Sequence, residues 1–86
     1  MLKNRVDKAG LKRVLILGAG YAGISLLQDI VRNPQHSYLP VGFVDDDPYK
    51  KNRVISGVRV LGKSEEMKAI ASMYKIDLII LAIPSF

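Results

Sequence analysis

The chain has 86 residues, of which 49% are hydrophobic and 24% are charged, a composition typical of one small globular domain. It contains no cysteine, which excludes disulfides and thiolate metal sites, and no apolar run reaches the roughly 18 residues that a membrane-spanning helix needs. The N-terminus also lacks the apolar core of a secretory signal, so we expect this chain to be soluble and cytoplasmic.

Basic charge is concentrated near the N-terminus. The net charge is +5, and residues 1–13 hold five basic side chains and one acidic one, which leaves residues 14–86 nearly neutral. A basic arm over residues 1–12 has three interpretations: a solvated tail, a segment that follows a membrane helix on the cytoplasmic side, or a nucleic-acid contact. The last is disfavoured and we expect no nucleic-acid partner, because the rest of the chain lacks a basic face and has few aromatic residues.

The first predicted elements are a buried strand and a helix. An unbroken apolar run over residues 14–17 is typical of a strand covered on both faces, as in a parallel sheet. Apolar residues at helical spacing predict an amphipathic helix over residues 21–33, which Pro34 ends. The predicted inward face of this helix consists of Ile24, Leu27, Ile30 and Val31.

Strands and helices alternate in the remainder of the chain. Further strands are predicted over residues 39–44, 57–62 and 77–83. Asp47 and Pro48 are typical of a helix start, with about one turn following over residues 49–52, and Ser64 is predicted to cap a helix that continues through Tyr74. This order predicts an α/β protein with a Rossmann-like three-layer α/β/α fold and a mostly parallel sheet, present as a partial βαβαβ half.

Three glycines follow the first predicted strand at G-x-G-x-x-G spacing. Gly18 allows a tight turn, Gly20 lets the backbone approach a pyrophosphate, and Gly23 lets the helix pack closely on the sheet. The N–H groups at the start of the helix then favour an anion. The predicted cofactor-binding residues of this turn are Gly18, Ala19, Gly20, Tyr21, Ala22 and Gly23.

An acidic residue stands where this motif requires one. Asp45 ends the second predicted strand, and a carboxylate there accepts hydrogen bonds from ribose hydroxyls and repels a 2′-phosphate. Asp45 and Asp46 are therefore predicted to bind a dinucleotide, NAD rather than NADP. The alternative is that the glycines only build a tight turn and that both aspartates are turn carboxylates. We predict no metal site, because Asp47 is placed to cap a helix and no fourth ligand is evident.

No catalytic motif accompanies the glycines. The four tyrosines have no lysine four positions on, which excludes the Y-x-x-x-K of short-chain dehydrogenases, and G-x-S-x-G and H-E-x-x-H are absent. We therefore predict that this chain carries no catalytic residues. The sequence also stops where a doubly wound fold would enter its second half, so we expect it to be a fragment of a larger protein.

The stretches RVLILGAGYAG, VGFVDDDP, GVRVLG and IDLIILAIPS resemble the N-terminal nucleotide-binding domain of the membrane-anchored nucleoside-diphosphate-sugar epimerase/dehydratases of bacterial polysaccharide biosynthesis. The resemblance covers about residues 12–86. It implies a nucleotide or nucleotide-sugar ligand, with Pro84 and Ser85 matching the motif at the end of the last strand. It also implies a domain over residues 13–86 that follows membrane helices at the cytoplasmic face of the inner membrane and precedes a catalytic domain.

Two other functions remain open. One is a non-catalytic regulatory or assembly domain with a degenerate pocket, whose exposed edge strand pairs with a second copy to form a homo-oligomer. The other is the equivalent module of a membrane-bound sugar-phosphate transferase or a sugar acyltransferase, because both families share this resemblance.

Overall fold

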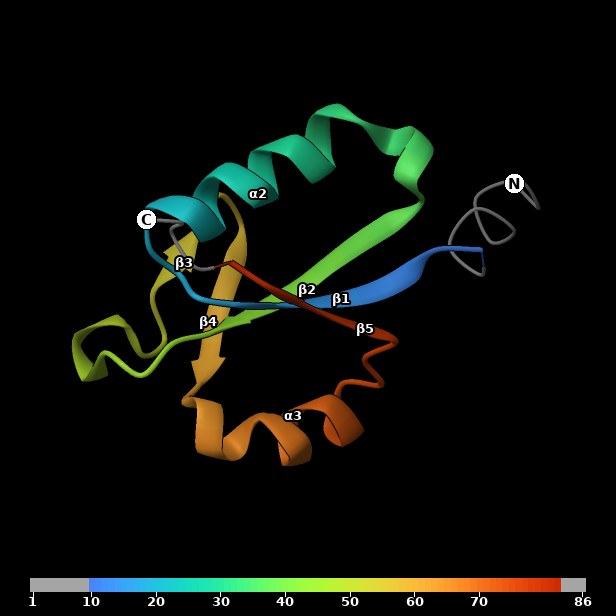
Figure 1. Cartoon of the computed structure of the whole chain (residues 1–86). Coiled ribbons are helices and arrows are strands. Elements are labelled where there is room, and N and C mark those ends of the chain that lie inside the picture. Colours follow the sequence, from blue (N-terminus) through green and yellow to red (C-terminus); the bar gives the residue numbers. More distant parts are fainter. Residues whose placement is uncertain (1–9, 83–86) are drawn as a thin grey trace.

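A computed structural model describes residues 10–82 (Figure 1). Strands β1, β2, β3, β4 and β5 are Lys12–Leu17, Tyr38–Val44, Val54–Ile55, Val58–Gly62 and Leu78–Leu81. Helices α2 and α3 are Tyr21–Arg32 and Met67–Met73, and the short 3₁₀ helices η1, η2 and η3 are Pro34–His36, Pro48–Lys50 and Ser64–Glu66. None of the helices within residues 10–82 is long and apolar enough to cross a membrane.

The five strands form one sheet in the order β3-β4-β2-β1-β5. The pairs β4–β2, β2–β1 and β1–β5 are parallel, and only β3 runs antiparallel to its neighbour. The predicted Rossmann-like α/β fold with a mostly parallel sheet is thus confirmed. β3 was not predicted, because it has only two residues; it joins β4 through Ser56 and Gly57, which both have positive φ angles, as a tight hairpin turn requires.

The two helices lie on opposite sides of the sheet and form a three-layer structure (Figure 1). A hydrophobic core lies on each side of the sheet, and alternate residues of the inner strand β1 pack into one core or the other. Val14 and Ile16 belong to the core that contains residues of α2, whereas Leu15 belongs to the core that contains Ile70 of α3. All three β1 side chains are 0% exposed, which explains why the strand reads as an unbroken apolar run.

The inward face of α2 differs from the prediction at two positions. Leu27 and Ile30 are buried as expected, and Leu26 packs against the same core. Val31 is 64% exposed, and Ile24 is only partly buried and lies outside this core. The buried stripe of α2 runs through Gly23, Leu26, Leu27 and Ile30. At about 100° per residue, Ile24 and Val31 lie together at the edge of this stripe, away from Leu26. The prediction for Val31 was wrong.

The start of the second helical segment also differs from the prediction. Ser64 is not its cap: its N–H and hydroxyl donate to Asp46 of the loop after β2. The N-cap is Lys63, whose N–H donates to the Glu66 side chain, and the segment begins with the 3₁₀ turn η3 before α3. Tyr74 lies just beyond the helix, which ends at Met73.

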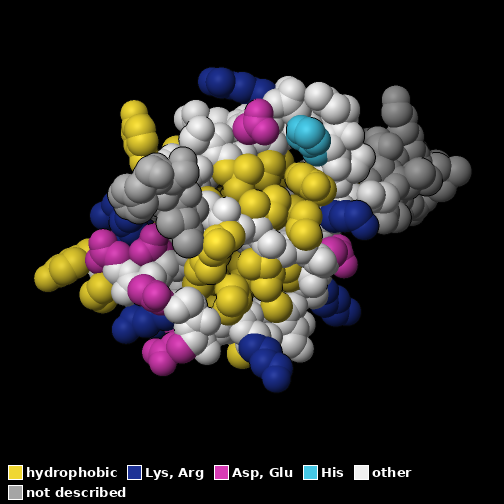
Figure 2. Space-filling model, viewed as in Figure 1, with side chains coloured by type: hydrophobic (Ala, Val, Ile, Leu, Met, Phe, Trp, Pro, Cys, Tyr) yellow, Lys and Arg dark blue, Asp and Glu magenta, His cyan; other side chains and the backbone are white. Residues whose placement is uncertain are grey.

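The outer edge of the sheet at β5 is apolar. Leu78 and Ile80 pack against the core shared with α2, whereas Ile79 and Leu81 are 42% and 60% exposed. Figure 2 shows hydrophobic side chains gathered in the middle of this view, where β5 crosses between the layers of α2 and α3. Ile83, the last residue of the predicted strand, lies outside the described residues.

A pair of truncations tests the packing of α2. Leu27→Ala should lower the free energy of unfolding by about 2–5 kcal/mol, because it removes buried methyl groups and leaves a cavity. Val31→Ala should change it by no more than about 0.5 kcal/mol, because most of its side chain faces solvent. Urea unfolding followed by circular dichroism measures both values, and equal losses would contradict this packing.

Candidate functional site

Two glycines of the G-x-G-x-x-G motif are required by the fold. Gly18 has a φ of +112°, and a Cβ there would lie 2.6 Å from the carbonyl oxygen of Ala82, just after β5. A Cβ on Gly23 would overlap the carbonyl oxygen of Gly18. The first position needs glycine for its conformation and for space, and the second lets α2 start against the end of β1.

Gly20 differs from both. Its φ of −90° and ψ of −156° are open to any residue. The only atom of the described residues within 4 Å of an added Cβ is Nζ of Lys50, at 3.7 Å, which is ordinary van der Waals contact. Neither the conformation nor the packing of this turn therefore requires glycine at position 20.

No side chain of residues 10–82 caps the N-terminus of α2 by a hydrogen bond. Gly20 is the N-cap and supplies no side-chain hydrogen bond, and the first turn contains no acidic residue. The first N–H groups of an α-helix have no partner within the helix, and the helix dipole makes this end positive. The predicted site residues Tyr21 and Ala22 lie in this first turn, and the Tyr21 side chain is 95% exposed.

Asp45 ties the end of β2 to the glycine turn. Its Oδ2 accepts a hydrogen bond from the N–H of Ala19 at 2.7 Å, and its Oδ1 accepts one from the N–H of Asp47 at 2.8 Å. Partial burial raises the pKa of Asp45, but the bonds from Asp47 and Ala19 and the nearby Lys50 ammonium outweigh it, so the pKa lies below its usual value. Each carboxylate oxygen keeps a lone pair for a further donor.

The three consecutive aspartates accept hydrogen bonds from different residues. Asp46 accepts hydrogen bonds from the N–H and hydroxyl of Ser64, at 2.7 and 2.9 Å, and these bonds lower the pKa of its carboxyl group. Asp47 caps η2 by accepting a bond from the N–H of Tyr49. The structure therefore turns Asp46 toward the start of η3 rather than toward the glycine turn. Within residues 10–82, no three His, Asp or Glu side chains are grouped to hold a metal ion.

Lys50 is a candidate site residue that the sequence analysis did not include. Its Nζ lies 3.7 Å from Oδ2 of Asp45, and it is the atom that faces Gly20. The sequence analysis placed Lys50 within the single turn predicted over residues 49–52, and in the structure it is the last residue of η2. The predicted residues Pro84 and Ser85 lie outside the described residues; Ala82, two residues before Pro84, lies close to Gly18.

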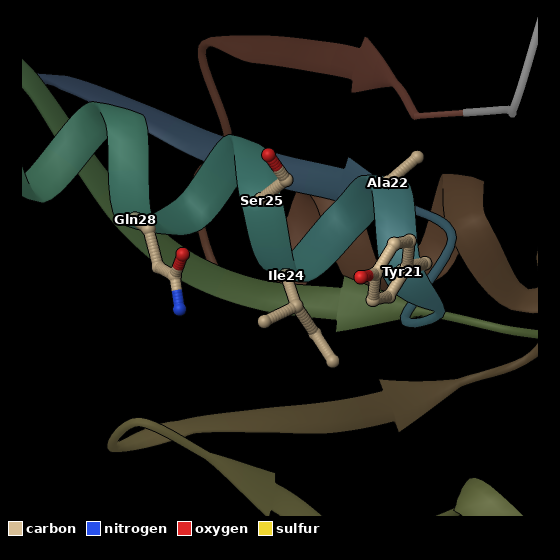
Figure 3. Close-up of a pocket in the computed structure, with 5 residues that line it drawn as sticks. All are labelled: Tyr21, Ala22, Ile24, Ser25 and Gln28. Atoms are coloured by element: carbon tan, nitrogen blue, oxygen red, sulfur yellow. The ribbon is translucent and has the colours of Figure 1, made fainter.

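A hollow of about 590 Å³ lies along the outer side of α2 (Figure 3). Its lining residues are Tyr21, Ala22, Ile24, Ser25 and Gln28. Figure 3 shows Tyr21, Ile24 and Gln28 projecting from one side of the helix and Ala22 and Ser25 from another. The lining of the hollow includes Tyr21 and Ala22 of the glycine motif but neither Gly20 nor Asp45. The hollow therefore adjoins the glycine turn and does not contain it.

The glycine turn lies at the point where the strand order reverses. From β1 the chain proceeds through α2 to β2 on one side, and from β4 it crosses back through α3 to β5 on the other side of β1. Open α/β sheets bind ligands in the crevice at the carboxyl ends of the strands at such a switch point. The fold and this turn define a Rossmann-like nucleotide-binding domain.

Residues 2–85 match the family described as CoA-binding domain, and the chain belongs to this family. The chain is 35% identical over 81 residues to the probable polysaccharide biosynthesis protein EpsC of Bacillus subtilis. It is 34% identical over 85 residues to the capsular polysaccharide biosynthesis protein CapD of Staphylococcus aureus. These alignments cover 94% and 98% of this chain but only 14% of each relative. The resemblance to the N-terminal domain of polysaccharide-biosynthesis proteins is thus confirmed.

Solved structures share the fold. UDP-D-quinovosamine 4-dehydrogenase from Vibrio fischeri superimposes with a TM-score of 0.76 and 29% identity, over 88% of this chain and 60% of that one. The Rex-family repressor RSP superimposes with a TM-score of 0.77 and 24% identity, over 98% of this chain and 39% of that one. RSP in complex with β-NADH gives a TM-score of 0.74 at 24% identity, over 98% and 40%.

The hydrogen bonds of Asp45 predict a pH dependence. A carboxyl group whose pKa is lower in the folded state stabilises the protein above its unfolded pKa of about 3.9 and loses this effect as the pH falls through the folded value. Asp45→Asn should therefore lower the unfolding midpoint at pH 7 and reduce its fall between about pH 5 and pH 2.

Thermal unfolding across this pH range measures the effect. Glu65→Gln is the control, because it removes one carboxylate from the exposed first turn of η3. Its pH profile should follow that of the unsubstituted chain. An Asp45→Asn profile as steep as that of the control would contradict the role given to Asp45.

Proposed function

We propose that this chain binds NAD(H) at the glycine turn, as the cofactor-binding module of a nucleotide-sugar epimerase or dehydratase of polysaccharide biosynthesis. The domain boundaries at residues 13–86, the basic arm at residues 1–12 and the cytoplasmic face of the inner membrane as its location belong to this proposal. The chain spans only 14% of the curated relatives it matches, and catalysis is assigned to other parts of such a protein.

The observation that carries the proposal is the glycine at position 20. Glycine costs roughly 0.5–1 kcal/mol of conformational entropy where another residue would fit. Gly18 and Gly23 relieve clashes of the fold itself, but Gly20 relieves none among the described residues. A ligand that must approach the backbone closely at this point explains the glycine, and the pyrophosphate of a dinucleotide is such a ligand.

The neighbouring groups fit the parts of a dinucleotide. The N–H groups at the start of α2 and the helix dipole favour the diphosphate. Asp45 holds the end of β2 against the turn and has lone pairs left for the hydroxyls of the adenosine ribose. Its negative charge disfavours the 2′-phosphate of NADP. Bound NAD would supply hydride transfer, and the residues of this chain would hold and orient it.

The similar proteins support the same ligand class. One is named as a dehydrogenase of a UDP-sugar, and RSP has been solved in complex with β-NADH, so this fold holds a dinucleotide in another protein. The polysaccharide biosynthesis proteins EpsC and CapD support a role in sugar modification.

Coenzyme A is the second candidate, favoured by the description of the family as a CoA-binding domain. Coenzyme A and NAD share an adenosine diphosphate, which is the part that the glycine turn would bind. They differ at the adenosine ribose, where coenzyme A carries a 3′-phosphate next to the position assigned to Asp45. Tighter binding of coenzyme A than of dephospho-coenzyme A or NADH would favour this candidate.

Two glycine-to-alanine substitutions test the proposed function. Gly20→Ala should change the free energy of unfolding by less than about 1 kcal/mol, because the turn accommodates a methyl group. It should weaken NADH binding by roughly tenfold or more, equivalent to about 1.4 kcal/mol. Gly23→Ala should lower the free energy of unfolding by about 1–3 kcal/mol or more, because its Cβ would overlap the Gly18 carbonyl.

Thermal unfolding with and without ligand measures both effects. At a hundredfold excess over its dissociation constant, NADH should stabilise the unsubstituted chain by about 2.7 kcal/mol, a shift of roughly 10 °C or more for a domain of this size. No shift with NADH, NADPH, UDP-sugar or coenzyme A would favour the alternative of a degenerate pocket.

A further inference from the structure

We propose that Lys50 is the residue through which this site selects nucleotides that carry a diphosphate. The inference rests on the proposed function, because it assumes that an adenine nucleotide binds at the glycine turn. Lys50 lies in the loop after β2, outside the glycine motif, and is here assigned a role in ligand specificity.

The backbone of η2 fixes the position from which Lys50 reaches the turn. Oδ1 of Asp45 accepts the N–H of Asp47, whose own side chain caps η2 at Tyr49. The N–H of Lys50 then donates to the carbonyl of Asp47 at 3.0 Å. These bonds anchor the 3₁₀ turn to the carboxylate that also holds Ala19 of the glycine turn.

The ammonium group of Lys50 flanks the open space above Gly20. Its Nζ is 3.7 Å from the position of a Cβ on this glycine, and its side chain is 24% exposed, whereas the next residue, Lys51, is exposed. A phosphate that approached the Gly20 backbone would thus meet the Lys50 ammonium on one side and the first N–H groups of α2 on the other.

The Lys50 and Asp45 charges offset each other, whereas the positive end of the α2 dipole has no counter-charge in its own first turn. The Lys50 cation lies beside this end of the helix. Asp45, whose Oδ2 lies 3.7 Å from the Lys50 ammonium, also accepts two backbone hydrogen bonds. A cation beside a helix N-terminus is unfavourable, and an anion bound between them would relieve the repulsion.

The contact with Asp45 does not engage Lys50 fully. Their separation of 3.7 Å exceeds the 2.7–2.9 Å or so of a charge-assisted hydrogen bond, so the two groups form a loose ion pair. Lysine has a flexible four-carbon stem and three donors, which allows its ammonium to contact a phosphate while it remains near Asp45. The two side chains thus bind different parts of the ligand: Asp45 accepts hydrogen bonds from the ribose hydroxyls, and Lys50 donates to the diphosphate.

Binding of ADP and of adenosine, followed by NMR titration, separates these roles. Lys50→Gln should weaken ADP binding by about tenfold or more, because it removes a hydrogen bond between two charged groups. Adenosine affinity should stay within about twofold of the unsubstituted value. Lys50→Arg should restore most of the ADP affinity. The control Lys51→Gln makes the same change in net charge at the neighbouring exposed position and should weaken ADP binding by less than about threefold.

Two results would overturn this inference but not the proposed function. One is that Lys50→Gln lowers the affinities for ADP and adenosine equally, which would indicate a structural role through Asp45. The other is that Lys50→Gln lowers the affinity for ADP no more than Lys51→Gln does. If the unsubstituted chain binds neither ADP nor NADH, the proposed function fails and the inference fails with it. Because this last result needs no variant, the two failures are distinguishable.

Discussion

The close approach of Gly23 to the carbonyl oxygen of Gly18 is the constraint on which the rest of the structure depends. It allows α2 to begin at the end of β1 and to lie across one face of the sheet, while α3 covers the other. The same turn lies close to Ala82 after β5, so one short segment brings together the ends of β1 and of the edge strand β5, at the point where the strand order reverses. Close packing therefore places the positive end of α2 in the crevice where such sheets bind ligands.

The polar bonds of the loop after β2 complete the site. Asp45 holds Ala19 of the glycine turn and Asp47 of its own loop, and Asp46 holds Ser64 at the start of η3. Adjacent carboxylates thus connect the loop after β2 to both helical layers. These hydrogen bonds position Lys50 beside the glycine turn. The first turn of α2 contains no acidic residue that would compete for the Lys50 ammonium.

Local patterns predicted the parts of the fold that depend on local chemistry. The apolar run of β1, the glycine turn and the cap at Asp47 were predicted because spacing and backbone conformation determine them. Val31, Ser64 and Lys50 were missed or misplaced because their environments depend on which elements meet in space. Ser64 is chemically suited to a helix cap, but Asp46, 18 residues earlier, takes both of its donors.

The central claim is that the backbone at Gly20 is kept accessible for the diphosphate of a nucleotide. Amide chemical shifts measured during an NADH titration of the unsubstituted chain test it most directly. The account predicts that the largest shifts occur at Ala19, Gly20, Tyr21 and Ala22, with smaller ones in η2. Shifts confined to the apolar edge at β5, or no shifts at saturating NADH, would contradict it.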